Sequence, residues 1–339
     1  MANKKFSEFT LKTDSANVDF VVGYDGTDNV RIAPSNLSSG GASSLNGLSD
    51  VLIDTTSEYV GTVPASLSGN PQGNTFLGIN AGASNTSAFK NTLIGNDAGT
   101  ATTSGSFNTV LGYQAAYSAT TTSQSVNIGF QAGYGATEAN SCVNIGMYAN
   151  HDINGRNKSG ATAIGKNSMY GGAAGINNTA IGYNASFGAS GSGGNNTCIG
   201  YNSSYSSGTV ANEFTLGNSS IATLRCAVTS ITSLSDERDK SEIKDISYGL
   251  DFIDSLQPRE FVWDNRAETD TDGEEFYSAN KGKKDFGFIA QEVQSVDDDT
   301  LRLVYDENPD KLELSYGKLV PILVQAIKEL KAEVELLKG

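Results

Sequence analysis

A serine and a lysine five residues apart lie where the composition of the chain changes. Ser235 and Lys240 bound a charged run, Ser235-Asp236-Glu237-Arg238-Asp239-Lys240, between a nearly uncharged glycine-rich array and a strongly charged C-terminal part. A serine hydroxyl is a weak nucleophile until a base removes its proton. A lysine amine can be that base only when it is neutral, which burial or a nearby cation such as Arg238 favours. The pattern predicts a Ser-Lys dyad that cuts its own chain.

The same residues have a structural interpretation. Ser235, Asp236 and Glu237 are typical of a helix N-terminus, in which a small polar residue caps the first turn and acids favour the positive end of the helix dipole. Taken alone, these three residues favour the cap over the dyad. The sequence on either side therefore decides between the two interpretations.

Three later stretches accompany the Ser-Lys run. They are 258–263 (PREFVW), 287–293 (GFIAQEV) and 314–316 (LSY), the last leading into a terminal helix. With 235–240, which fits the pattern S-D-x-R-x-K, they resemble the self-cleaving intramolecular chaperone domains of phage tail fibres, tailspikes and endosialidases. The resemblance covers residues 233–339. It implies that Ser235 is the nucleophile, Lys240 the base and Arg238 a supporting residue, and that the Ser235–Asp236 bond is cut.

The route of attack stays open at this level. Attack by Ser235 on its own carbonyl would form a strained four-membered ring. Attack on the preceding carbonyl would cut the Leu234–Ser235 bond instead, and attack from a neighbouring chain of a trimer would avoid the strain.

The middle of the chain is periodic. A Leu-Gly or Ile-Gly pair recurs with spacings of 17, 17, 17, 17, 19, 17, 18 and 17 residues, and its glycines are Gly78, Gly95, Gly112, Gly129, Gly146, Gly165, Gly182, Gly200 and Gly217. Such a period predicts a solenoid of short strands and tight turns, in which each Ile or Leu stacks on its equivalent and the glycine has positive φ or a close neighbour. The stretches 162–168 and 179–185 resemble the head repeats of trimeric autotransporter adhesins, which are parallel β-rolls.

An aromatic residue or methionine follows several repeat glycines. These residues are Tyr113, Phe130, Met147, Tyr183 and Tyr201. They could form an exposed ladder for sugars or pack against the other chains of a trimer, and the second interpretation is preferred. We expect Cys142 and Cys198 to be small buried residues and His151 to lie at the surface of an enlarged loop.

Charge and composition exclude several classes of function. The net charge of −15 argues against a nucleic-acid partner. No long apolar run, signal peptide, zinc-like cysteine spacing or second histidine occurs, so we expect no membrane insertion, no metal and no cofactor. Residues 72–225 carry four acids and five bases, whereas 226–339 carry 26 acids and 14 bases, which predicts a domain boundary near Cys226.

The terminal residues predict a helix with a heptad repeat. Its apolar positions are spaced 4, 3, 4, 3, 4 and 3 residues apart and comprise Tyr316, Val320, Leu323, Ile327, Leu330, Val334 and Leu337. Pro321 is tolerated only near the start of a helix. The heptad is typical of a coiled coil. The residues at its a and d positions favour two chains by intrinsic preference, whereas both resemblances imply three, which is the number that we expect. The alternative is that this face packs against its own domain. A second amphipathic helix is expected through Ile243, Ile246, Leu250 and Ile253.

These patterns predict a mainly β chain, a trimeric parallel β-solenoid or β-roll of 17-residue repeats followed by a small α+β chaperone domain that ends in a coiled-coil helix. We expect a virion-attachment module at 1–36, a Ser/Gly-rich neck at 37–71, the repeats at 72–225, and the chaperone autoprotease at 226–339. The resemblance implies a homotrimeric phage tail fibre, assembled in the host cytoplasm, that binds a tail or adaptor protein and a glycan or protein on the bacterial surface. The receptor-binding residues are unknown.

Two other functions compete with this one. The first is a tailspike depolymerase, which would need two close carboxylates, whereas the repeats hold only Asp97, Glu138, Asp152 and Glu213. The second is a bacterial surface adhesin, which would need a secretion signal and a membrane anchor.

Overall fold

The computed structural model describes residues 21–24, 29–32, 51–53, 57–61, 64, 68 and 72–339, except 153, 155–157, 172–174, 187–191, 228–230, 270–274 and 298–299. Strands β1 (Val21–Tyr24) and β2 (Asn29–Ile32) form an antiparallel pair. Most of the predicted attachment module and neck lies outside the described residues.

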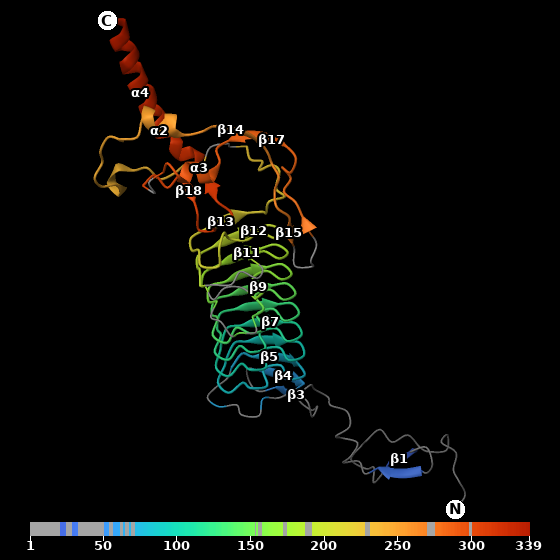
Figure 1. The fold of residues 1–339 in the computed structure, drawn as a ribbon. Coiled ribbons are helices and arrows are strands. Elements are labelled where there is room, and N and C mark those ends of the chain that lie inside the picture. The colour runs from blue at the N-terminus through green and yellow to red at the C-terminus, as the bar shows by residue number, and fades with distance from the viewer. Residues whose placement is uncertain are drawn as a thin grey trace, which may run out of the picture.

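A parallel β-solenoid occupies the middle of the chain (Figure 1). Strand β3 (Val51–Ile53) pairs antiparallel with β4 (Glu58–Gly61), and from β4 onward each strand pairs in parallel with the next. The following strands are β5 (Thr75–Gly78), β6 (Thr92–Ile94), β7 (Thr109–Leu111), β8 (Val126–Ile128), β9 (Val143–Ile145), β10 (Thr162–Ile164), β11 (Thr179–Ile181), β12 (Thr197–Ile199) and β13 (Phe214–Leu216). The predicted mainly β solenoid is therefore confirmed.

The repeat position requires glycine for both of the predicted reasons: its φ is positive, and the backbone of the next rung lies close to it. At Gly129, φ is 132° and an added Cβ would lie 2.6 Å from the carbonyl oxygen of Gly146 in the next rung. Gly112 repeats the arrangement against Gly129, with φ of 143° and a distance of 2.4 Å. A side chain at this corner would strain the backbone and collide with the rung that follows.

Each strand from β6 to β12 has a buried middle residue and two flanking residues that point outward. In β10, Ala163 is buried between half-buried Thr162 and Ile164. The equivalent isoleucines stack in register, as Ile164 does on Ile181. The predicted stacking is confirmed, but these side chains line the outside of the solenoid because side chains alternate along a strand.

A ladder of buried asparagines runs through the interior next to the strands. The Asn91 side-chain carbonyl accepts the backbone N–H of Asn108 at 2.9 Å, and its amide donates to the Gly105 carbonyl at 2.8 Å. In the same way, the Asn74 side-chain carbonyl accepts the backbone N–H of Asn91, and that of Asn196 accepts the backbone N–H of Glu213. Because each bond joins neighbouring rungs, the polar interior fixes their register while satisfying buried groups.

The enlarged rung differs from the prediction for His151. Its side chain is buried, 7% exposed, and its ring stacks between those of Tyr134 and Tyr170 at 5.0 Å on either side. The adjacent Asp152 turns inward to an ion pair with Lys158 at 3.4 Å. The surface prediction for His151 was wrong because tyrosines of the neighbouring rungs enclose its ring. Cys142 and Cys198 are buried, as predicted.

The C-terminal region, residues 226–339, contains short helices and small antiparallel sheets. After the single turn η4 (Glu237–Asp239) come α2 (Leu250–Ser255), β14 (Arg259–Val262), β15 (Glu268–Thr269), β16 (Glu275–Phe276), β17 (Lys284–Gly287), α3 (Ala290–Gln294), β18 (Val304–Tyr305), β19 (Glu313–Leu314), η5 (Tyr316–Lys318) and α4 (Leu319–Lys338). Strand β14 pairs with β17, β15 with β16, and β18 with β19.

The helix expected through Ile243 and Ile246 is shorter than predicted. It begins only at Leu250, whose backbone N–H is capped by the Glu329 carboxylate at 2.6 Å. Ile243 is 67% exposed and lies outside any helix. The apolar spacing therefore marked the right residues for a helix only from Leu250 onward, where a long-range cap supplies the start.

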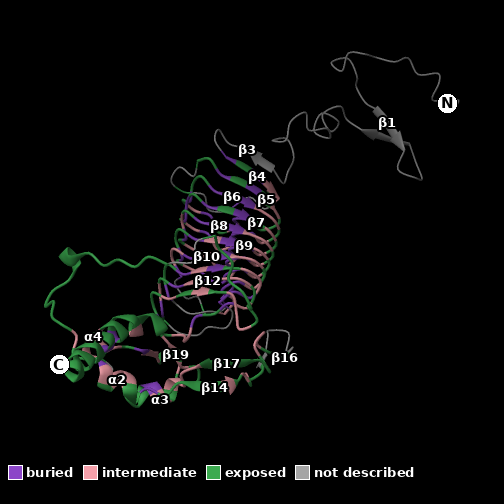
Figure 2. Cartoon of the chain, turned by 90° about the horizontal axis from the view of Figure 1, so that it is seen from above, coloured by how far each residue is buried: buried purple, intermediate pink, exposed green. Residues whose placement is uncertain are grey.

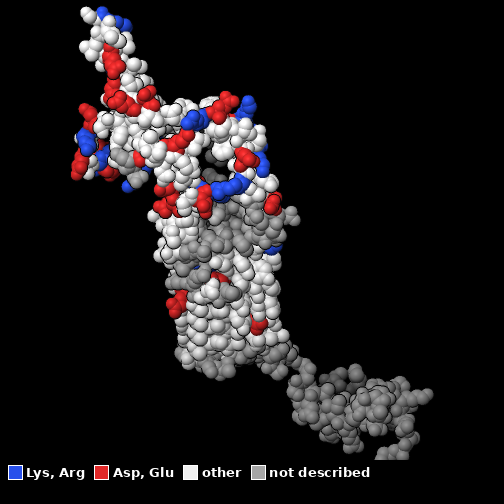
Figure 3. Space-filling view, viewed as in Figure 1, with Lys and Arg blue, Asp and Glu red and all other residues white. Residues whose placement is uncertain are grey.

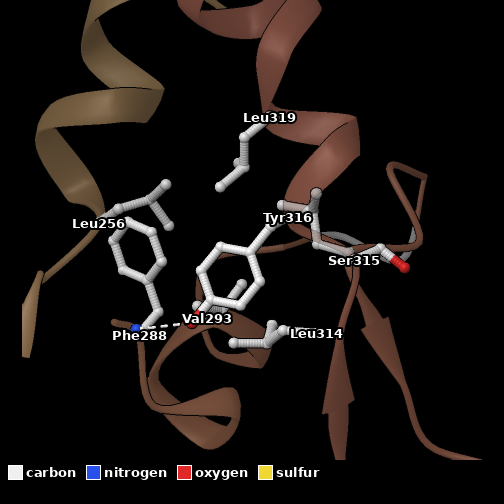
Figure 4. Close-up of a pocket in the computed structure, with 8 residues that line it drawn as sticks. Leu256, Phe288, Val293, Leu314, Ser315, Tyr316 and Leu319 are labelled. Carbon is white, nitrogen blue, oxygen red and sulfur yellow. Dashed lines mark hydrogen bonds between the residues drawn. The ribbon is translucent and has the colours of Figure 1, made fainter. Parts of the chain in front are cut away.

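A small apolar core joins α2, α3, the β18–β19 pair and the start of α4. Its buried centre is Leu256, Val293 and Leu303. Figure 4 shows Tyr316 between these side chains, with its hydroxyl accepting the backbone N–H of Phe288 at 3.1 Å. The lining encloses a cavity of about 10 Å³, roughly the size of one water probe, so it is a packed core and not a ligand pocket.

Helix α4 begins next to Pro321 and spans 20 residues. The residues that it buries are Ile322 and Ala326, on the side that contacts α2. The heptad residues within α4, from Val320 onward, lie on the exposed remainder; Ile327 is 66% exposed and Leu337 is 87% exposed. The stripe is therefore not the face by which α4 packs on its own domain, and the other alternative, contact with other chains, remains.

Candidate functional site

The Ser235–Lys240 pair predicted from the sequence is in direct contact. The Lys240 amine donates to the Ser235 hydroxyl at 2.6 Å and to the Ser235 backbone carbonyl at 3.2 Å. The turn η4 between them brings the two ends of the run together, with the Lys240 backbone N–H bonded to the Glu237 carbonyl. One amine thus touches both a potential nucleophile and the carbonyl of the Ser235–Asp236 bond.

Asp236, and not Ser235, caps the turn. Its carboxylate accepts the Arg238 backbone N–H at 2.9 Å. The Arg238 guanidinium also bonds to this carboxylate, at 3.0 and 2.6 Å, and these bonds hold the pKa of Asp236 below its ordinary value. The cap leaves the Ser235 side chain available to Lys240. The charge of Arg238 is directed at Asp236, while Lys240 faces Ser235.

The whole segment is exposed in the single chain. Every residue from 231 to 245 is exposed, and η4 lies on a loop that projects from the solenoid and from α2 and α4 (Figure 2). Two apolar residues next to the site, Ile231 and Leu234, are 95% and 98% exposed. A lysine base requires a desolvated environment, which this segment lacks unless another surface covers it.

The other sequence motifs are brought together in the C-terminal region. Arg259 of the second motif forms a two-pronged ion pair with Glu292 of the third, at 3.0 and 2.8 Å. The Tyr316 hydroxyl of the fourth bonds to Phe288 of the third. An added Cβ at Gly287 would lie 2.6 Å from that hydroxyl, which explains the glycine. The motifs therefore build one small framework, separate from the exposed Ser235–Lys240 pair.

Residues 235–302 match the family described as chaperone of endosialidase. The match begins at Ser235 and spans the first three motifs. No curated protein and no solved structure matches the chain. Together with the parallel β-solenoid, the match fits a phage tail-fibre or tailspike-like protein with a C-terminal chaperone. Residues 226–339, which contain this match, are called the chaperone region below.

The chaperone region carries most of the charge, whereas the visible face of the solenoid is nearly uncharged (Figure 3). Within the described residues, no cluster of three or more His, Cys, Asp or Glu side chains could hold a metal ion. No described helix combines the length and apolarity needed to cross a membrane.

Two contacts outside the motifs were missed by sequence analysis. One is the Glu329 cap on Leu250. The other joins Glu213, in the last rung of the solenoid, to Tyr305 of β18 at 3.0 Å. The only sequence signal was that Glu213 occupies a position where several earlier rungs have asparagine, including Asn178 and Asn196.

Proposed function

We propose that this chain forms a homotrimeric phage tail fibre that attaches to the bacterial surface, and that its chaperone region cuts its own covalent link to the fibre at the Ser235–Asp236 bond. The single observation that carries the cleavage is the contact of Lys240 with both the hydroxyl and the carbonyl of Ser235. The N-terminal part would bind the tail or an adaptor, and the solenoid would present the receptor-binding surface.

The chemistry is acyl transfer between chains. The Ser235 hydroxyl of one chain attacks the Ser235 carbonyl carbon of a neighbour, and neutral Lys240 takes the hydroxyl proton. The carbon–nitrogen bond to Asp236 breaks, and Lys240 passes the proton to the departing amine. Water then hydrolyses the ester and restores the serine. Attack between chains avoids the four-membered ring that attack within one residue would require.

Assembly provides the cover that the site lacks. The uncovered heptad residues of α4 and the exposed Ile231 and Leu234 are apolar surfaces that three chains can bury together. The solenoid adds outward residues along its length: Leu77, Ile79, Leu111, Tyr113, Phe130, Met147, Ile181, Tyr201 and Leu216. Dependence on assembly would delay cleavage until the chains are in register.

Cleavage after folding has a kinetic benefit. Long parallel structure forms slowly because its contacts are non-local. A trimerising region at the C-terminus holds three chains together while the rungs form, and cutting its covalent link to the fibre afterwards leaves a fibre that unfolds slowly and cannot readily reassemble.

The carboxylates of the solenoid do not favour a depolymerase. Asp152 is buried against Lys158, and Glu213 is bonded to Ser206 and Tyr305. The two other acids in residues 72–225, Asp97 and Glu138, are in different rungs. We therefore propose binding without hydrolysis of a surface polysaccharide.

Intact mass spectrometry of the full chain tests the cleavage. Wild type should yield fragments 1–235 and 236–339, whereas Ser235→Ala and Lys240→Arg should remain whole. Lys240→Arg keeps the positive charge but cannot supply a neutral base at physiological pH. Glu237→Ala, at an exposed neighbour, is the matched control and should cleave normally.

The outcomes separate the alternatives. A long fragment ending at Leu234 would show attack on the preceding carbonyl. Cleavage of Ser235→Ala at the wild-type rate would overturn the dyad. A wild type that is monomeric in native mass spectrometry would overturn the fibre proposal altogether.

A further inference from the structure

The asparagine ladder of the solenoid ends in a carboxylate. The Glu213 backbone N–H still donates to the Asn196 side chain at 2.9 Å, as in the earlier rungs. Among the described residues, no further rung follows whose backbone N–H the Glu213 side chain could accept. Strand β13, which begins one residue later, is the last strand of the sheet. Exposed sheet edges are hazards for mispairing and are normally covered.

Several donors of the last rung hold the Glu213 carboxylate in place. One oxygen accepts the Ser206 backbone N–H at 2.9 Å and the Thr215 hydroxyl at 3.0 Å. The other accepts the Ser206 hydroxyl at 2.6 Å. The residues of the last rung are thus enough to hold the carboxylate in place without the chaperone region.

A further donor to this carboxylate comes from the chaperone region. The Tyr305 hydroxyl donates to Glu213 at 3.0 Å and lies 3.3 Å from the Ser206 hydroxyl. Tyr305 belongs to β18, 92 residues further along the chain. Burial, followed by the Glu213 charge, raises the pKa of Tyr305, so the phenol keeps its proton and remains a donor.

The strand opposite contributes a competing charge. Glu313 of β19 is the cross-strand partner of Tyr305. Burial, followed by the Glu213 charge, raises the pKa of Glu313, while Lys311 opposes this shift. Glu307 adds a further negative charge near Tyr305. The contact therefore combines a favourable phenol–carboxylate bond with repulsion between two carboxylates.

We propose that the β18–β19 hairpin is the C-terminal cap of the solenoid, and that the Tyr305–Glu213 contact keeps the chaperone region docked on the last rung after the chain is cut. In this proposal, the segment that covers the last rung is the β18–β19 hairpin of the same chain. Cleavage at Ser235 places Glu213 and Ser206 in the long fragment and Tyr305 and Glu313 in the short one. This part of the inference rests on the proposed self-cleavage.

The charges give the docked state a pH dependence of defined sign. The Glu213 charge, which the solenoid brings to Glu313 in the docked state, contributes to the raised pKa of Glu313, so protonation of Glu313 is favoured in the docked state. The contribution is fully present below the ordinary glutamate value of 4.5 and is lost as pH rises through the raised value. Docking should thus weaken from mildly acidic towards neutral pH.

Native mass spectrometry of the self-cleaved protein tests retention of the short fragment. We expect wild type to retain it, Tyr305→Phe to lose it at least tenfold more readily, and Glu313→Gln to hold it more tightly with a flattened pH dependence. The two variants act in opposite directions on neighbouring positions, so a general loss of folding cannot produce both results.

Hydrogen exchange on the uncut Ser235→Ala chain separates this inference from self-cleavage. Tyr305→Phe should speed exchange at residues 206–216, whereas the early rungs should be unchanged. Faster exchange in an uncut protein would support the cap even if the cleavage proposal fails. Unchanged exchange together with unchanged retention in Tyr305→Phe, or no gain with Glu313→Gln, would overturn the cap.

Discussion

The solenoid and the chaperone region solve the problem of burial in different ways. The solenoid closes its interior within one chain, because small side chains, asparagine ladders and repeat glycines meet their equivalents one rung away. The chaperone region buries few apolar residues, centred on Leu256, Val293 and Leu303, and leaves other large ones exposed, among them Phe286 and Leu337 at 85% and 87%. The solenoid repeats a local rule, whereas the chaperone region leaves apolar surface that the proposed trimer would cover.

The largest effect is expected where the local rule leaves no freedom. Gly129→Ala should destabilise the solenoid by about 3 kcal/mol or more, because the new Cβ meets the next rung and the backbone has positive φ. Gly171→Ala is the matched control: its φ of 61° is also positive, but an added Cβ meets nothing within 4 Å. It should cost about 1–2 kcal/mol. Denaturant unfolding measures both, and equal losses would contradict the close-packing argument.

A charge on the exposed heptad stripe should disrupt trimer formation by the chaperone region and leave the rungs of the solenoid unchanged. Ile327→Asp should convert trimers to monomers, because a buried aspartate in a three-chain core is strongly unfavourable. Ala332→Asp, on the outer face of the same helix, is the control and should remain trimeric. Native mass spectrometry measures the oligomer. A trimeric Ile327→Asp protein would show that this stripe is not the interface.

The smallest changes in stability are expected for the loss of single polar contacts, one from each region. Asn91→Ala should destabilise the solenoid by about 1–3 kcal/mol, since it leaves the buried Asn108 N–H and Gly105 carbonyl without their partner. Arg259→Ala removes an exposed ion pair with Glu292, where solvent replaces the lost bonds, and should change stability little. Thermal unfolding measures both, and a larger loss for Arg259→Ala would reverse the comparison.

The sequence determined the features that depend on spacing. The repeat glycines predicted the solenoid and its close approaches, because a fixed period places equivalent residues one rung apart. The apolar spacing and Pro321 predicted the terminal helix and where it begins. The Ser235–Lys240 run named two residues that meet, since a single turn between them is enough to bring their side chains together.

The tertiary structure decided the features that depend on distant residues. The helix expected from Ile243 begins only at Leu250, where Glu329 provides a cap from 79 residues away. His151 is buried because tyrosines of neighbouring rungs enclose it. The role of Glu213 as the end of the ladder depends on Tyr305, which no periodicity connects to it. The repeats can be predicted from local sequence because each rung has the same pattern as the one before it. Caps and junctions cannot, because they depend on contacts with residues that are far away in the sequence.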